Sequence, residues 1–164
     1  MGKQCPSSNL IGQKKITVIA TGVFYQNYVM VNGKTYIEDG KHIKKDFSRG
    51  EEKVARWLSQ KLGTEVKLIP KVDYPHGIKT PDYIIKNEKW DLKRLTSNKN
   101  NAIYTAIRDR QKQANNFVID ISKSKLTMKQ AELQTKELYK IKTVNWLNKV
   151  IIKKNNEFIK ITRK

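Results

Sequence analysis

From residue 48 onward, the chain alternates helical and extended segments in an order that leaves few folds open. Capping boxes predict the start of two helices, one at Ser48 with Glu51 and one at Thr127 with Gln130. Between and after these helices, β-branched and aromatic runs bounded by turn residues predict strands. The predicted order is helix, strand, loop, hairpin, helix, strand, helix, hairpin. We therefore expect an α+β domain, with helices packed on a twisted, mainly antiparallel sheet.

The same local signals set the predicted boundaries. Gly63 is placed to end the first helix in the left-handed conformation, and Asn87-Glu88 is expected at the turn of the central hairpin. The predicted segments are the helix 51–62, the strand 65–70, the hairpin 82–93, the helix 101–113, the strand 116–122, the helix 128–139 and the hairpin 143–162.

The N-terminal part has a different character. Asn32-Gly33 stands between two β-branched, aromatic runs, and this dipeptide favours a tight turn because both of its residues tolerate positive φ. We expect a β-hairpin at about 15–38. The sequence thus predicts a basic, β-rich N-terminal segment, 1–47, added to an α+β domain, 48–164.

The charge indicates the class of partner. The chain has 34 Lys and Arg against 15 Asp and Glu, a net charge of +19, and no apolar run approaches the ~18–20 residues that span a bilayer. A basic excess of this size favours RNA or another polyanion over a membrane surface. The residues that we expect to contact RNA are Lys44, Lys45, Lys71, Lys79, Arg94, Arg108, Gln113, Lys153 and Lys154.

Common catalytic motifs are missing from the sequence. It has no HExxH, no glycine-rich phosphate loop and no G-x-S-x-G, so hydrolase triads and nucleotide-binding P-loops have no support. Polar and charged residues concentrate instead at 71–93. Two hypotheses for this region remain open, beside the simpler one that its charged residues are solvated loop and surface positions.

The first hypothesis is a metal-dependent nuclease. Pro81-Asp82 followed by Asp91-Leu92-Lys93 matches the loose pattern P-D-x(n)-[D/E]-x-K. Two carboxylates from neighbouring strands can share Mg²⁺, while the lysine orients a water or stabilises the phosphorane. Because side chains alternate along a strand, Asp91 and Lys93 would face the same side.

The second hypothesis is a ribonuclease without a metal. RNA supplies its own nucleophile, the 2′-hydroxyl, so the enzyme needs only an acid, a base and cations. His76, Asp82, Asp91 and Lys93 are the candidates for these roles, with Lys79 and Thr80 as phosphate contacts. Outside this region, Asp120 interrupts an apolar strand and requires either a structural cation partner or a role in a site.

The strings KTPDYIIKNEKWDLK and NAIYTAIRDRQKQANNFVIDI resemble the C-terminal tRNase domain of contact-dependent inhibition (CdiA-type) toxins. The resemblance implies the barnase/EndoU/colicin/RelE-like nuclease superfamily, metal-independent cleavage of tRNA or another structured RNA, no cofactor, and a cognate immunity protein as partner. The residues that match the polar positions of this family are Thr80, Asp82, Asp91, Lys93 and Gln113.

The sequence also departs from these toxins. It begins at Met1 and adds the basic segment 1–47, which is typical of a phage or mobile-element protein acting in the bacterial cytoplasm. This difference leaves a non-catalytic alternative open: an anti-CRISPR protein that binds or truncates the guide RNA of a CRISPR effector or another ribonucleoprotein.

Overall fold

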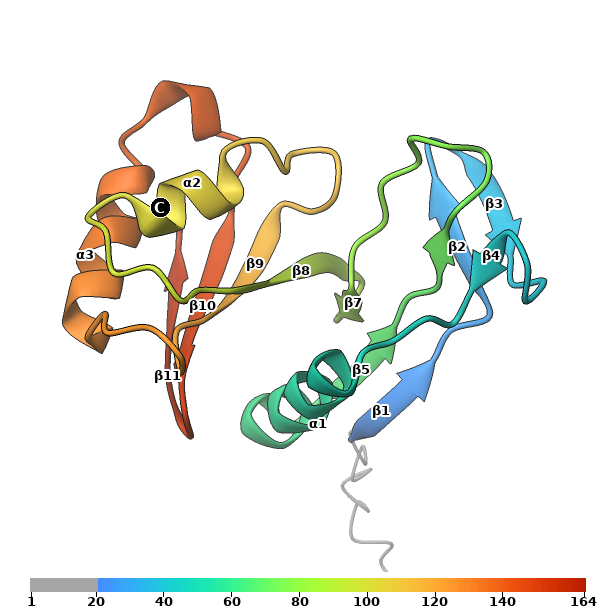
Figure 1. Ribbon diagram of the computed structural model, residues 1–164, viewed down its shortest axis with the longest axis horizontal. Coiled ribbons are helices and arrows are strands. Elements are labelled where there is room, and N and C mark those ends of the chain that lie inside the picture. The colour runs from blue at the N-terminus through green and yellow to red at the C-terminus, as the bar shows by residue number, and fades with distance from the viewer. Residues whose placement is uncertain (1–20) are drawn as a thin grey trace, which may run out of the picture.

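A seven-stranded sheet forms the centre of the computed structural model, which describes residues 21–164 (Figure 1). Its strand order is β1-β5-β7-β8-β9-β10-β11. These strands are β1 (Gly22–Tyr25), β5 (Glu65–Leu68), β7 (Tyr83–Ile85), β8 (Glu88–Arg94), β9 (Asn116–Asp120), β10 (Lys149–Lys154) and β11 (Glu157–Thr162). The helices are α1 (Arg49–Leu62), α2 (Ala102–Ile107) and α3 (Met128–Leu138), with a 3₁₀ turn at Lys142–Val144.

Two small sheets make a separate lobe at one end of the molecule. They pair β2 (Tyr28–Val31) with β3 (Lys34–Ile37), and β4 (Ile43–Lys44) with β6 (Lys71–Val72). Five of the eight strand pairs in the described residues are antiparallel, and β1-β5, β8-β9 and β9-β10 are parallel. The predicted α+β class, with its mainly antiparallel pairing and N-terminal hairpin, is therefore confirmed.

Helices cover both faces of the central sheet, and the alternation of side chains along β8 shows which residues face which helix. Trp90 and Leu92 point to one face, where they pack against Leu58 of α1. The other face packs against α2 and α3 through a second core that includes Phe117 and Ile119. Asp91 and Lys93 belong to this second face, because successive strand residues point to opposite sides. No helix within residues 21–164 is both long and apolar enough to cross a bilayer.

The predicted turn of the N-terminal hairpin is correct. Asn32 and Gly33 join β2 to β3 with φ values of 51° and 75°, the positive φ values that a tight hairpin turn requires. The part of the predicted hairpin at 15–20 lies outside the described residues. β1 pairs in parallel with β5, so the N-terminal segment also adds a strand to the central sheet. The domain boundary at residue 47 stays a prediction.

Both predicted capping boxes form. The Ser48 hydroxyl accepts from the Glu51 amide while the Glu51 carboxylate accepts from the Ser48 amide, and Thr127 and Gln130 repeat the arrangement at α3. Gly63 ends α1 with φ 59°. These contacts are local, and this explains why the helix starts were readable from the sequence.

The helix predicted over 101–113 is wrong beyond residue 107. α2 ends at Ile107, and residues 108–113 form turns. This stretch contains no apolar residue to pack on the sheet, and burial of Ala114 requires the chain to turn back toward β9. The turn has a functional consequence, because it carries Gln113 to β8.

Candidate functional site

Two carboxylates meet where β7 and β8 pair. Asp82 directly precedes β7, and its Oδ2 atom accepts a hydrogen bond of 2.8 Å from the Leu92 amide of β8. Asp91 lies on β8 and its side chain is only 1% exposed. The antiparallel β7-β8 hairpin therefore brings together two acids that stand nine positions apart in the sequence.

Lys93 supplies the positive charge beside this pair. Its Nζ atom lies 2.5 Å from Asp91 Oδ2, and the lysine side chain is 20% exposed. Gln113 Nε2 approaches Asp91 Oδ1 from the other side at 3.4 Å. Within residues 21–164, Gln113 Oε1 is buried without a hydrogen-bond partner. This amide oxygen thus remains available to a ligand, while Asp91 Oδ2 is occupied by the Lys93 ammonium.

The electrostatics of the pair are unfavourable without a further cation. Burial, the negative charge of Asp91 and the charge of Glu51 raise the pKa of Asp82 to about 7, against the opposing effects of the Leu92 amide and Lys93. A carboxyl group with an ordinary pKa would be fully ionised at neutral pH. Burial and the neighbouring charges therefore keep Asp82 partly protonated near neutral pH. Such a shift of pKa is typical of functional sites.

Glu51 is a third acid close to Asp82. The sequence indicated Glu51 only as a capping residue. Its Oε2 accepts from the Ser48 amide at 2.6 Å, and its Oε1 lies 3.3 Å from Lys71 Nζ. Burial acts to raise the pKa of Glu51, but the Ser48 hydrogen bonds and Lys71 outweigh it, so this pKa is lowered. The Tyr83 hydroxyl donates to the Glu51 carbonyl at 2.9 Å and so joins the start of α1 to β7.

The oxygen atoms of the site are of the kind that a hard cation such as Mg²⁺ prefers. The protein alone does not provide a complete set of ligands. Within residues 21–164, no three His, Cys, Asp or Glu side chains stand close enough together to hold a metal ion. Asp82 and Asp91 provide two carboxylates, and the unpartnered Gln113 Oε1 provides a neutral oxygen. Mg²⁺ commonly binds through one or two carboxylates and fills its remaining positions with waters and substrate phosphates.

The other predicted catalytic residues do not all join this group. Thr80 is half-buried just before Pro81, and Lys79 is exposed beside it. His76 was predicted as an acid or base, and the structure does not bring it to the carboxylates. Its ring is exposed and packs edge-on against Tyr74 at 5.7 Å. Backbone hydrogen bonds from residues 73 and 74 to the His42 carbonyl hold that loop against the small lobe.

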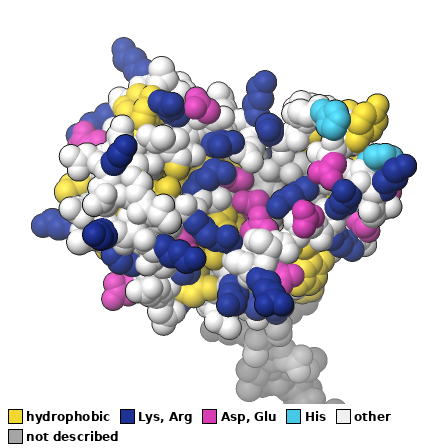
Figure 2. All heavy atoms as spheres, in the orientation of Figure 1, with side chains coloured by type: hydrophobic (Ala, Val, Ile, Leu, Met, Phe, Trp, Pro, Cys, Tyr) yellow, Lys and Arg dark blue, Asp and Glu magenta, His cyan; other side chains and the backbone are white. Residues whose placement is uncertain are grey.

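Figure 2 shows one face of the molecule in space-filling form, with side chains coloured by type. Acidic side chains gather in the middle of this face, and Lys and Arg side chains surround them on several sides. The histidines lie over the small lobe, away from the central acidic group. A polyanionic strand crossing this face would meet cations beside these acidic side chains.

Several of the predicted RNA-binding cations have partners within the fold. Lys44 pairs with Asp73 at 2.9 Å. The Lys154 ammonium donates to the carbonyls of Ser124 and Leu126, which a phosphate contact would have to displace. The remaining intramolecular pairs of these cations join Lys45 to Glu38, Lys71 to Glu51, Arg108 to Asp109 and Lys153 to Asp120.

Asp120, the acid in the apolar strand β9, has the structural partners that its burial requires. Its Oδ2 lies 3.6 Å from Lys153 Nζ, and its Oδ1 accepts from the Ser122 hydroxyl at 2.5 Å. The interpretation of Asp120 as a structural residue therefore has direct support. Glu51, by contrast, was missed as a site residue, because its approach to Asp82 depends on how α1 packs on the sheet.

Comparison with known proteins agrees with this picture. Residues 79–158, which include Asp82, Asp91, Lys93 and Gln113, match the family model of the contact-dependent growth inhibition CdiA C-terminal domain. A solved structure, the CdiA-CT/CdiI toxin and immunity complex from Burkholderia pseudomallei, contains a similar chain, 25% identical with a TM-score of 0.55. The match covers 69% of this chain and 82% of that one. No curated protein sequence matches significantly. Residues 79–158 of the chain are thus similar in sequence to the CdiA C-terminal domain, and most of the chain shares its fold with a chain of the CdiA-CT/CdiI complex.

Proposed function

We propose that this chain is a metal-dependent endonuclease in which Asp82 and Asp91 hold Mg²⁺. The observation that carries this proposal is the carboxylate pair of half-buried Asp82 and buried Asp91, with Lys93 2.5 Å from Asp91. Burial and then the repulsion from Asp91 raise the pKa of Asp82. A divalent cation would remove that repulsion and stabilise both groups in their ionised form.

Each residue of the site has a defined part in this proposal. Mg²⁺ would polarise the scissile phosphate and promote attack by water. Lys93 lies where its ammonium can stabilise the negative charge that develops on the phosphorane. Gln113 holds the orientation of Asp91 through its amide, and Glu51 adds negative charge close to Asp82.

This arrangement supports the metal-dependent hypothesis over the one without a metal. Cleavage by the 2′-hydroxyl requires a general base next to the reacting atoms. His76, one of the four candidates for the acid and base roles, lies in the small-lobe loop, which leaves Asp82, Asp91 and Lys93. Asp82, Asp91 and Lys93 remain together, and they are the set that the metal-dependent pattern uses.

RNA is the substrate that we propose, and tRNA is the first RNA to test. The net charge of +19 supports a polyanionic substrate, and the resemblance to toxin tRNases favours RNA over DNA. A cognate immunity protein is the proposed protein partner, because the similar solved chain is part of a toxin and immunity complex. An anti-CRISPR role stays a prediction from the sequence alone.

The test is cleavage of total tRNA by purified protein, with Mg²⁺ or with EDTA, resolved on a denaturing gel. We expect discrete fragments with Mg²⁺ and intact RNA with EDTA. Asp91→Asn keeps the shape of the side chain while removing its charge, and it should abolish cleavage. Asp109→Asn is the matched control, since Asp109 is 78% exposed and pairs with Arg108 rather than with Asp82, Asp91 or Lys93.

The outcomes separate the hypotheses. Equal cleavage in EDTA and Mg²⁺ would overturn the proposed chemistry and restore the metal-independent one. Cleavage by Asp91→Asn at the wild-type rate would show that the site is misplaced. Cleavage of plasmid DNA in place of RNA would keep the site and change the substrate.

A further inference from the structure

A basic cavity lies on the other side of the sheet from Asp91 and Lys93. It has a volume of about 530 Å³, which is in the range of small-molecule sites. It opens beside α1 at the carboxyl ends of β8, β9 and β10, which are parallel to one another. Ligands in α/β sheets bind outside the carboxyl ends of parallel strands. The lining includes Lys53, Arg94, Asp120, Lys123 and Lys153.

The charge of the cavity is strongly positive. Its four cations face a single acid, Asp120, which already pairs with Lys153 and accepts from Ser122. Among the described residues, Lys53, Arg94 and Lys123 take part in no ion pair. Three cations around one cavity repel one another, so an anion in it would relieve the repulsion.

Gly50 gives the cavity a specific shape. A Cβ atom at this position would lie 2.3 Å from Arg94 Nη2 and 2.5 Å from Arg94 Cζ. The guanidinium of Arg94 therefore lies directly against the first turn of α1, where only glycine leaves room for it. A planar guanidinium can bind a phosphate through two parallel hydrogen bonds, and that of Arg94 has no partner of its own among the described residues.

The cavity also has an apolar wall. Val54, Trp57 and Leu95 line it, and the Trp57 ring is held by the Phe158 ring at 5.5 Å and by Lys153 Nζ at 5.2 Å. A fixed aromatic and aliphatic wall next to cations suits a nucleotide, whose base is apolar on its faces and whose phosphate is charged.

We propose that this cavity binds one nucleotide of the RNA strand, with its phosphate on Arg94 and Lys53, outside the site of cleavage. The proposal rests on the proposed function for the identity of the strand. Arg94 directly follows Lys93 and ends β8, so the strand end forms a rim between the two faces. An RNA strand passing over this rim would place one nucleotide in the cavity and another at the carboxylates.

The experiment measures RNA binding without cleavage. A labelled single-stranded RNA is titrated in EDTA with the Asp91→Asn protein, and fluorescence anisotropy gives Kd at several salt concentrations. Two changes address the cavity. Gly50→Ala displaces the Arg94 guanidinium without altering the net charge, and alanine suits a helix better than glycine. Lys53→Ala removes one of the proposed phosphate contacts.

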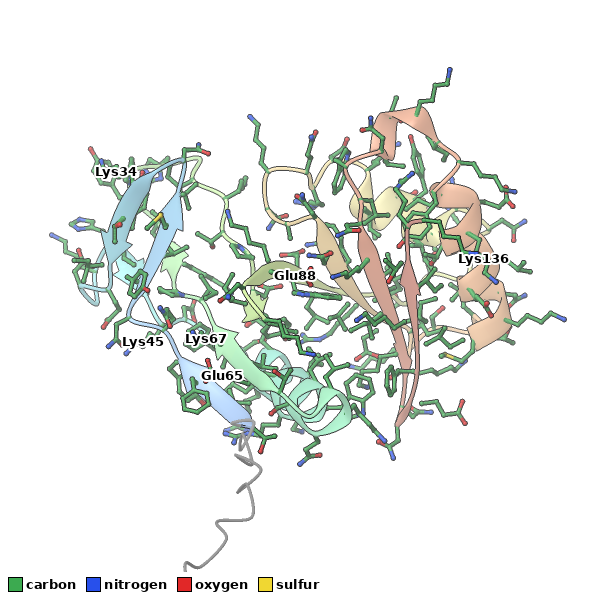
Figure 3. All side chains as sticks on the ribbon, turned by 180° about the vertical axis from the view of Figure 1, so that it is seen from behind. Lys34, Lys45, Glu65, Lys67, Glu88 and Lys136 are labelled. Atoms are coloured by element: carbon green, nitrogen blue, oxygen red, sulfur yellow. The ribbon has the colours of Figure 1, made fainter. Side chains whose placement is uncertain are left out.

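The matched controls are Lys34→Ala and Lys136→Ala, which make the same change in charge elsewhere. Lys34 lies in the small lobe and Lys136 on α3, at opposite ends of the molecule (Figure 3). We expect Gly50→Ala and Lys53→Ala each to raise Kd roughly tenfold, as for the loss of one good phosphate contact. Lys53→Ala should also flatten the dependence of log K on log salt by about 0.7.

A second titration distinguishes a phosphate that belongs to an RNA strand from the phosphate of a free nucleotide. 5′-AMP is added to the isotope-labelled protein, and amide shifts are followed by NMR. The proposal expects weak 5′-AMP binding in the cavity and a larger loss of RNA affinity in both variants. Loss of 5′-AMP binding with unchanged RNA affinity would overturn it in favour of a free-nucleotide site. Equal weakening in cavity variants and controls would also overturn it, because it would show only general charge. Neither titration requires cleavage. Failure of the proposed catalysis would therefore not affect how the binding results are interpreted.

Discussion

Asp82→Asn should make the protein more stable at neutral and alkaline pH. Asp82 is largely buried beside Asp91, and its pKa is about 7 in the folded protein against an ordinary value of 3.8. For an acid whose folded pKa is raised, folding favours the protonated form. The wild-type protein therefore loses stability as the pH rises from about 4 to about 7, and this loss is complete above pH 7.

The size of the effect follows from the two pKa values. A difference of one pKa unit corresponds to about 1.4 kcal/mol, so the penalty at pH 8 is on the order of 4 kcal/mol. Asparagine keeps an oxygen that can accept from the Leu92 amide, and it carries no charge. Relative to wild type, the stability of Asp82→Asn should thus improve by about 3 kcal/mol between pH 4.5 and pH 8.

Urea unfolding of both proteins at a series of pH values in EDTA measures this difference. Mg²⁺ should raise the stability of wild type at pH 8 and should have a much smaller effect on Asp82→Asn. Any constant offset from the substitution itself cancels, because only the change with pH is diagnostic. Parallel stability curves for the two proteins from pH 4.5 to pH 8 would refute the reasoning.

Three further predictions concern catalysis and the fold. At limiting Mg²⁺, kcat/KM should rise through about pH 7, because cation binding needs the ionised form of Asp82, and a flat profile from pH 5.5 to 8 would contradict this. Arg163 donates to the carbonyls of Tyr139, Val144 and Leu147, so Arg163→Ala should cost about 2–3 kcal/mol of unfolding free energy; a loss no larger than that of Lys164→Ala would count against it. Gly63→Ala places a side chain at φ 59° and should cost about 1 kcal/mol in thermal or urea unfolding, with Lys61→Ala as the neutral reference.

Local chemistry explains which parts of the fold could be read from the sequence. The capping boxes at Ser48 and Thr127 and the turn at Asn32-Gly33 depend on residues only a few positions apart, and all of them form. The turn of the β7-β8 hairpin differs by one position from the prediction, because Lys86 and Asn87 are the residues with positive φ. Such a shift leaves the pairing of the hairpin intact.

Non-local packing explains what could not be read. The parallel pairing of β8 with β9 and of β9 with β10 brings together segments separated by helices, and nothing in the single segments indicates it. The end of α2 at Ile107 depends on the burial of Ala114 and on the return of the chain to β9. The local sequence predicted that this helix would continue to residue 113.

The candidate site shows the same division. The spacing of Asp91 and Lys93 predicted that both point to one face of a strand, and their contact of 2.5 Å agrees with this. The hairpin then brought Asp82 to them. Gln113 and Glu51 reach the site through a turn and through helix packing, which no local pattern encodes. His76 was favoured for its chemistry, but its loop folds toward β4.

The central claim is that Asp82 and Asp91 would hold a cation that supplies an activated water, so that cleavage would not need the 2′-hydroxyl of the RNA. The most direct test is cleavage, with Mg²⁺ present, of an RNA that carries a single 2′-deoxy nucleotide at the mapped cleavage position. Our account predicts cleavage at a rate close to that of the all-ribose RNA, and products without a 2′,3′-cyclic phosphate. Complete resistance of the 2′-deoxy RNA, together with cyclic phosphate ends on the normal RNA, would contradict it.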